Sequence, residues 1–251
     1  ARGAIDDKGP TMAVVFALHM IKELGLSLNK RVRLIFGTDE ESGDWVGLRK
    51  YFADQPMPVM GFAPDANFPI ITTEKGILIC HLVQTSPSQQ TGRADGWTLT
   101  SFHSGQRVNM VADEAEATLS GNGDVFAIKE KFQSYLMEQR IKGFAEEKDE
   151  HLLLRLEGLS HHGMEPHKGL NAGLALARFL HEIDLDERGQ QFISLIYTHF
   201  VDGFFGEKLS IRYKDDISGQ LTVNVGTFNY TVDGEAKLGV NIRYPVTATV
   251  D

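Results

Sequence analysis

Three short acidic segments near the start of the chain carry side chains that could bind metal ions or move protons. They are Ile5-Asp6-Asp7-Lys8-Gly9, Gly37-Thr38-Asp39-Glu40-Glu41-Ser42 and Pro64-Asp65-Ala66-Asn67-Phe68-Pro69. Divalent cations are bound by carboxylate oxygens that separate loops bring together. Adjacent Glu40 and Glu41 could have different roles: one could bind a metal while the other acts as general base on a bound water. One such segment alone could simply complement a helix dipole, but three in succession favour a metal site.

The elements expected to carry these segments alternate between helix and strand. Apolar residues at helical spacing predict a helix that ends near Gly25 and a second helix that begins near Ser42. Residues 31–36, which are rich in Val, Leu and Ile, predict a strand, and residues 59–62 predict another short buried strand. This alternation is typical of a parallel α/β sheet, in which active-site residues collect at the carboxyl ends of the strands.

From residue 77 the pattern becomes that of an α+β module that includes antiparallel strands. Strands are expected at 77–83, 97–102, 115–119, 152–156, 221–225 and 238–242. Helices are expected directly after Asp124, a good N-cap, and near 170–183 and 187–201. The polar segment 86–95 is expected to be a loop, and the acidic run 146–150 a solvated connector.

Composition and charge exclude several classes of protein. The net charge of −9 argues against a general binder of nucleic acid or anionic membranes. The single cysteine, Cys80, excludes an intrachain disulfide framework and a cysteine zinc cage, and its apolar surroundings indicate a buried hydrophobe rather than a nucleophile. No apolar stretch is long enough to span a bilayer. We therefore expect a soluble, cytoplasmic protein.

Later motifs extend the pattern of the acidic segments along nearly the whole chain. The full set is Ala1–Pro10, Gly37–Ser42, Pro64–Pro69, Glu74–Gly76, Asn109–Val111, Gly158–Gly163, Gly169–Ala172 and Asn241–Pro245. In this order the motifs resemble those of the M20 metallopeptidases, and most closely those of the bacterial PepV-type dipeptidases, relatives of carnosinase. The resemblance implies part of a zinc-peptidase-like α/β catalytic domain in residues 1–76, followed by an α+β lid domain with an antiparallel sheet in residues 77–251.

The resemblance also implies roles for the acidic side chains. Asp6 matches the carboxylate that bridges two metal ions, while Glu41 and Asp65 each match a terminal ligand of one metal. Glu40 matches the general base. The two divalent metals would be zinc, with manganese or cobalt as substitutes.

In the lid, the resemblance implies three residues that contact the substrate. His162 would stabilise the tetrahedral oxyanion, although the neighbouring His161 leaves open a shift of this assignment by one residue. Asn109 and Arg243 match substrate-binding positions, and Arg243 suits a two-point grip on a free carboxylate. By residue type alone, a histidine pair in a polar loop is typical of an exposed surface, and Arg243 could equally form a surface salt bridge.

The function implied is metal-dependent hydrolysis of dipeptides with a free N-terminus, by a monomeric enzyme that binds neither nucleic acid nor membrane. An N-acyl amino acid deacylase of the same family is an alternative, because the family shares the metal-binding segments. A third possibility is a metal-dependent binding module without turnover. The family's first and last ligand histidines have no counterpart in this sequence, so residues 1–251 are expected to be an internal part of the enzyme that is inactive alone.

Overall fold

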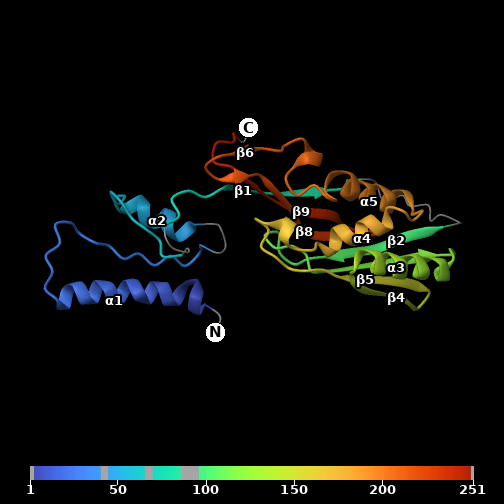
Figure 1. Cartoon of the computed structure of the whole chain (residues 1–251), viewed down its shortest axis with the longest axis horizontal. Helices are drawn as coiled ribbons and strands as arrows, with labels where there is room; N and C mark the ends of the chain where they lie inside the picture. The colour runs from blue at the N-terminus through green and yellow to red at the C-terminus, as the bar shows by residue number, and fades with distance from the viewer. Residues whose placement is uncertain (1–2, 41–44, 66–69, 86–95, 250–251) are drawn as a thin grey trace. The chain divides into compact units, whose positions relative to one another are not determined.

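The computed structural model describes residues 3–40, 45–65, 70–85 and 96–249, and the chain divides into two compact units (Figure 1). Unit 1 is Ala1–Thr72 and unit 2 is Thr73–Asp251. Together they contain helices and an antiparallel sheet, which confirms the predicted mixture of α/β and α+β structure. Among the described residues, no helix combines the length and the apolar character needed to cross a bilayer.

Unit 1 consists of helices joined by irregular segments. Its helices are η1 (Ala4–Lys8), α1 (Gly9–Glu23) and α2 (Val46–Asp54). The helix α1 ends at Glu23, its C-cap is Leu24, and Gly25 follows in the left-handed region with a φ of 62°. Glycine has no Cβ to clash there, which is why it so often follows a helix. Both predicted helices are therefore present, while the predicted start near Ser42 lies outside the described residues.

The two strands predicted in unit 1, at 31–36 and 59–62, are wrong, because both segments are irregular. A strand is defined by hydrogen bonds to a neighbouring strand, and no strand is present in the described part of unit 1. None of its described residues is buried, and Phe16, Phe36 and Phe62 are 59%, 63% and 84% exposed. Hydrophobic burial within this unit therefore stabilises it little.

Unit 2 is organised around a seven-stranded antiparallel sheet with the order β1-β9-β8-β2-β3-β5-β4. The strands are β1 (Gly76–Val83), β2 (Trp97–Ser104), β3 (Glu114–Gly121), β4 (Lys142–Lys148), β5 (His151–Glu157), β8 (Thr222–Thr231) and β9 (Ala236–Tyr244), with a separate pair β6 (Lys214–Asp215) and β7 (Gly219–Gln220). The helices are α3 (Val125–Gln139), α4 (Ala172–Leu180) and α5 (Glu187–His199), with short turns η2 (Pro166–Lys168) and η3 (Glu207–Leu209). The strands and helices expected in this region are all present.

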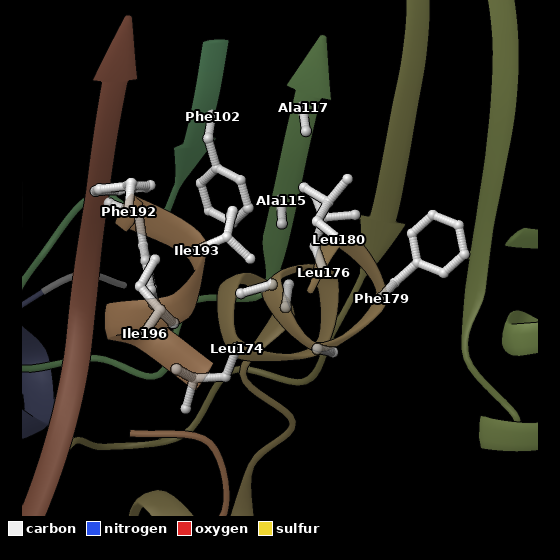
Figure 2. Close-up of a cluster of buried hydrophobic side chains, with 14 of the residues drawn as sticks. Phe102, Ala115, Ala117, Leu174, Leu176, Phe179, Leu180, Phe192, Ile193 and Ile196 are labelled. Carbon is white, nitrogen blue, oxygen red and sulfur yellow. The ribbon is translucent and has the colours of Figure 1, made fainter. Parts of the chain in front are cut away.

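The core of unit 2 lies between the sheet and its helices. Figure 2 shows side chains of β2 and β3 facing those of α4 and α5. Phe102 of β2 is fully buried, and its ring lies 6.0 Å from that of Phe192 and 5.8 Å from that of Phe228. Burying each such side chain contributes roughly 1.5–3 kcal/mol, so this core stabilises unit 2 in a way that unit 1 lacks.

Side-chain caps begin the three main helices of unit 2. Asp124 accepts from the amide of Ala127 at 3.0 Å, and Asn171 accepts from that of Leu174 at 3.1 Å. Asp186 accepts from Gly189 at 3.1 Å and also from the Leu99 amide of β2 at 2.8 Å. Asp186 therefore both starts α5 and ties that helix to the sheet.

Three further expectations in unit 2 have different outcomes. The acidic run 146–150 is not a connector, because its first three residues belong to β4, which pairs with β5 at the sheet edge. Edge strands accept charged side chains, which also discourage pairing with other chains. Cys80 is half-buried in β1, and burial raises the pKa of its thiol, which disfavours the nucleophilic thiolate. The loop predicted at 86–95 lies outside the described residues.

The two aspartate caps should differ in their effect on stability. Asp124→Ala should lower the free energy of unfolding by about 1 kcal/mol, the usual loss for an exposed N-cap. Asp186→Ala should lower it by about 2–4 kcal/mol, because the buried Leu99 amide also loses its acceptor. Urea denaturation of the chain, followed by circular dichroism, measures both values. Equal losses would contradict the tie between α5 and β2.

Candidate functional site

Two of the predicted metal-binding residues, Asp6 and Asp65, lie in the described part of unit 1. Asp6 lies in η1 just before α1, with a φ of −120° and a ψ of 96°, and the Asp6–Asp7 peptide bond is cis. The Asp7 side chain accepts a hydrogen bond from the Thr11 hydroxyl at 3.0 Å. Asp7 is therefore engaged with the first turn of α1.

The second and third acidic segments are described in part. Asp39 accepts from the amide of Gly47 at 2.8 Å, which links the turn containing Glu40 to the start of α2. Glu41 lies outside the described residues, whereas Asp65 lies within them. In the described ranges, no three His, Cys, Asp or Glu side chains come together as a metal site. The carboxylates of Asp6 and Asp65 are nevertheless the kind of oxygen donor that divalent cations take.

Two loops of unit 2 bring the predicted residues Asn109 and His162 close together. Met110 and His162 form an antiparallel bridge, and the Gly163 amide donates to the Asn109 carbonyl at 2.7 Å. In the opposite direction, the Val111 amide donates to the His161 carbonyl at 2.8 Å. The Asn109 and His162 residues are both exposed.

Arg243 lies on β9 within electrostatic reach of His162. It is on the face opposite Leu238, Val240 and Ile242, as the alternation of the strand predicted. Its Nε donates to Oδ1 of Asn241 at 3.1 Å. Burial lowers the pKa of Arg243, while the carboxylate of Glu74 opposes this shift.

The surroundings of the His162 imidazole favour its neutral form. Although the residue is exposed, partial burial of its ring lowers the pKa from the usual 6.5. The nearby Arg243 and His161 lower it further, and the carboxylate of Glu165 opposes the shift. Its Nδ1 accepts a hydrogen bond from the Met164 amide at 3.2 Å. The proton of the neutral ring therefore lies on Nε2, which leaves one N–H donor.

The Glu74-Lys75-Gly76 motif is explained by packing at the start of β1. A Cβ at Gly76 would fall 2.0 Å from a ring carbon of Tyr244, so only glycine fits. The Lys75 ammonium donates to the Gln220 carbonyl at 2.5 Å. Burial lowers the pKa of Lys75, although the carboxylates of Asp215 and Glu165 oppose the shift.

Two buried asparagines that the sequence patterns did not mark contact this region. Asn224 of β8 donates to the carbonyls of Val108 and Met110, on either side of Asn109. Asn241 accepts from Arg243, as described above. Both occupy the polar positions of alternating strands, which usually face solvent. Only their place in the middle of strongly apolar strands could have marked them.

Comparison with known proteins assigns the chain to a family. The profile of Peptidase family M20/M25/M40 matches residues 1–248. "Putative dipeptidase YtjP" of Bacillus subtilis (strain 168) is 49% identical over 251 residues, which are 99% of this chain and 53% of that protein. "Putative dipeptidase SH1171" of Staphylococcus haemolyticus (strain JCSC1435) is 39% identical over 245 residues, which are 98% of this chain and 52% of that protein. The chain thus spans about half the length of the curated relatives it matches, and it belongs to the M20 peptidases.

Proposed function

We propose that the complete protein hydrolyses dipeptides with the help of divalent metal ions. Membership of the M20 peptidases supports peptide hydrolysis, and the names of the similar proteins support dipeptides as substrates. The observation that carries the proposal is the convergence in unit 2 of the loops carrying Asn109 and His162 with the charge of Arg243. Together they offer a neutral N–H donor and a cation, which suit an oxyanion and a carboxylate.

In this proposal, residues 1–76 form part of the catalytic domain. Asp6, Glu41 and Asp65 would hold two metal ions, zinc by preference, with Asp6 shared between them. The chemistry that the bound metals supply is polarisation of the scissile carbonyl and a lower pKa for the attacking water. Glu40 takes a proton from that water and delivers it to the leaving amine.

Residues 77–251 form the lid domain in this proposal, and His162 stabilises the oxyanion. Its Nε2–H is the donor, because Nδ1 already accepts from Met164. A donor fixed in this tautomer before the substrate binds stabilises the transition state without reorganising. His162 suits this role better than His161, whose Nδ1 is buried without a partner among the described residues.

Arg243 binds the substrate carboxylate in this proposal, and Asn109 contacts the substrate beside it. With Nε bonded to Asn241, the two terminal nitrogens of Arg243 are left for a carboxylate. Partial burial of Arg243 strengthens such a pair, because fewer waters compete for the guanidinium.

Substrate assays of the complete protein with Zn²⁺ or Mn²⁺ test the proposal. We expect turnover of unblocked dipeptides and little turnover of N-acetyl amino acids. The reverse preference would indicate the deacylase of the same family. Metal binding without turnover of either substrate would indicate a binding module.

Replacement of Glu40 should separate metal binding from chemistry. In the complete enzyme, Glu40→Gln should retain its metal and lose on the order of 10²–10⁴ in rate, the usual cost of removing a general base. Metal analysis and steady-state kinetics measure the two properties. Glu23→Gln, at the end of α1, is the matched control and should leave both unchanged. Near-normal activity of Glu40→Gln would refute the assignment.

Replacement of Arg243 should change specificity for the carboxylate. Arg243→Lys should raise KM for dipeptides roughly 10- to 100-fold, because lysine keeps the charge and loses the planar two-point grip. C-terminally amidated dipeptides should be affected little. Kinetics on matched free and amidated substrates give the comparison. Equal losses on both would mean that Arg243 is structural.

The pKa of His162 should respond to Arg243. NMR titration of the chain should place the His162 pKa below 6.5 with the neutral proton on Nε2, and Arg243→Gln should raise this pKa. Since the folded chain binds this proton less tightly than the unfolded chain, the group favours unfolding as the pH falls below about 6.5. Arg212→Gln serves as a control on a residue that is not among the causes of the shift. A pKa at or above 6.5 would contradict the described environment.

A further inference from the structure

Two buried asparagines lie directly opposite each other on neighbouring strands, close to the loop that carries Asn109. The pairing of β8 with β9 places Asn224 opposite Asn241. They are 1% and 0% exposed, although both lie on the face of the sheet opposite the apolar core positions. A loop covers them, since a Cβ at Gly226 would fall 2.5 Å from the Arg107 carbonyl oxygen and the Val108 backbone. The sequence therefore buries two amides where an alternating strand usually faces solvent.

Asn224 fixes the backbone around Asn109. Its Nδ2 donates to the Val108 carbonyl at 2.9 Å and to the Met110 carbonyl at 2.8 Å. The carbonyl of Asn109 itself accepts from the Gly163 amide. Three successive carbonyls are thus held, and Gly163 packs closely against the second of them, since a Cβ there would fall 2.8 Å from the Asn109 carbonyl oxygen.

Asn241 fixes the guanidinium of Arg243 from two residues earlier on the same strand. Residues i and i+2 of a strand share a face, and Oδ1 of Asn241 accepts from Nε of Arg243 at 3.1 Å. A bond to Nε limits rotation of the guanidinium plane, on which a two-point grip depends. The cross-strand pair therefore reaches both proposed substrate-binding residues.

We propose that Asn224 and Asn241 are positioning residues for substrate binding. Asn224 fixes the backbone conformation of the loop that carries Asn109, and Asn241 fixes the orientation of the Arg243 guanidinium plane. This inference rests on the proposed function, because it takes Asn109 and Arg243 to contact the substrate. Supporting side chains of this kind hold a binding site in its productive geometry before binding.

The incomplete hydrogen bonding of the pair argues against a role in stability alone. Oδ1 of Asn224 and Nδ2 of Asn241 are buried without a partner in the described part of the chain. An unmade buried hydrogen bond disfavours folding, so these two amide atoms add nothing to stability. Leucine at these positions could not form the hydrogen bonds that fix the loop and the guanidinium.

Hydrogen exchange of the 251-residue chain tests the hold on the loop without any assay of activity. Asn224→Leu should speed exchange of the Val111 and Gly163 amides about tenfold relative to that of Leu154 in the core, which corrects for any global loss of stability. Asn229→Ala, on the same strand with its amide bonded to Glu235, is the control and should leave the ratio unchanged. Asn224→Asp, which keeps the shape and loses the donor, replaces the leucine variant if that variant does not fold. An unchanged ratio overturns the role of Asn224.

Kinetics of the complete enzyme test the hold on Arg243. Asn241→Leu should raise KM for free dipeptides about tenfold, with little change in kcat and little effect on amidated dipeptides. A purely structural role would affect both substrates alike, and that result overturns the role of Asn241.

Arg243→Lys, assayed in parallel, reports on the proposed function itself. If Arg243→Lys discriminates between the substrates and Asn241→Leu does not, the positioning role fails and the proposed function stands. If Arg243→Lys does not discriminate, the proposed carboxylate contact fails, and the inference about Asn241 fails with it.

Discussion

The pairing of β8 with β9 is the interaction on which the candidate site of unit 2 depends. Its register places Thr222 opposite Arg243 and Asn224 opposite Asn241 on one face, while Val225 and Val240 face the core. Because side chains alternate along a strand, a slip of one residue would bury Arg243 among apolar helices and expose the valines. The hydrophobic effect that holds the helices on the sheet therefore also fixes which polar side chains meet the loops.

The two units differ in how their functional residues are supported. In unit 2, strand pairing, helix caps and a buried core hold the loops that carry Asn109 and His162. In unit 1, the acidic turns flank helices that bury none of their described residues. A 15-residue helix such as α1 is only marginally stable by itself in water. Apolar partners outside the unit would therefore be needed to fix the turns of Asp6 and Glu40.

In unit 2, electrostatics and hydrogen bonding both favour a neutral His162 ring with its proton on Nε2. Partial burial and the charge of Arg243 lower the pKa of His162, which favours the neutral ring, and the Met164 amide sets the position of its proton. A charged imidazole would be repelled by the nearby guanidinium. A neutral imidazole is not repelled and can still donate one hydrogen bond. The fold thus accommodates a cation and a neutral N–H donor close together, which is the combination proposed to bind a carboxylate and an oxyanion.

Local residue patterns by themselves determined most elements of unit 2, because the caps and the apolar alternation depend on near neighbours. Asp124 and the alternation of 238–242 predicted α3 and β9 correctly, and the motifs pointed to the M20 family. The predicted strands at 31–36 and 59–62 were wrong, since a strand needs a partner that local sequence does not specify. Only the tertiary structure decided two further features. It brings residues 109, 162 and 243 together, and it buries Asn224 and Asn241 beneath a loop. Such contacts join residues far apart in the sequence, up to 116 positions for Asn224 and Val108, and their geometry follows from strand register and loop packing rather than from residue type.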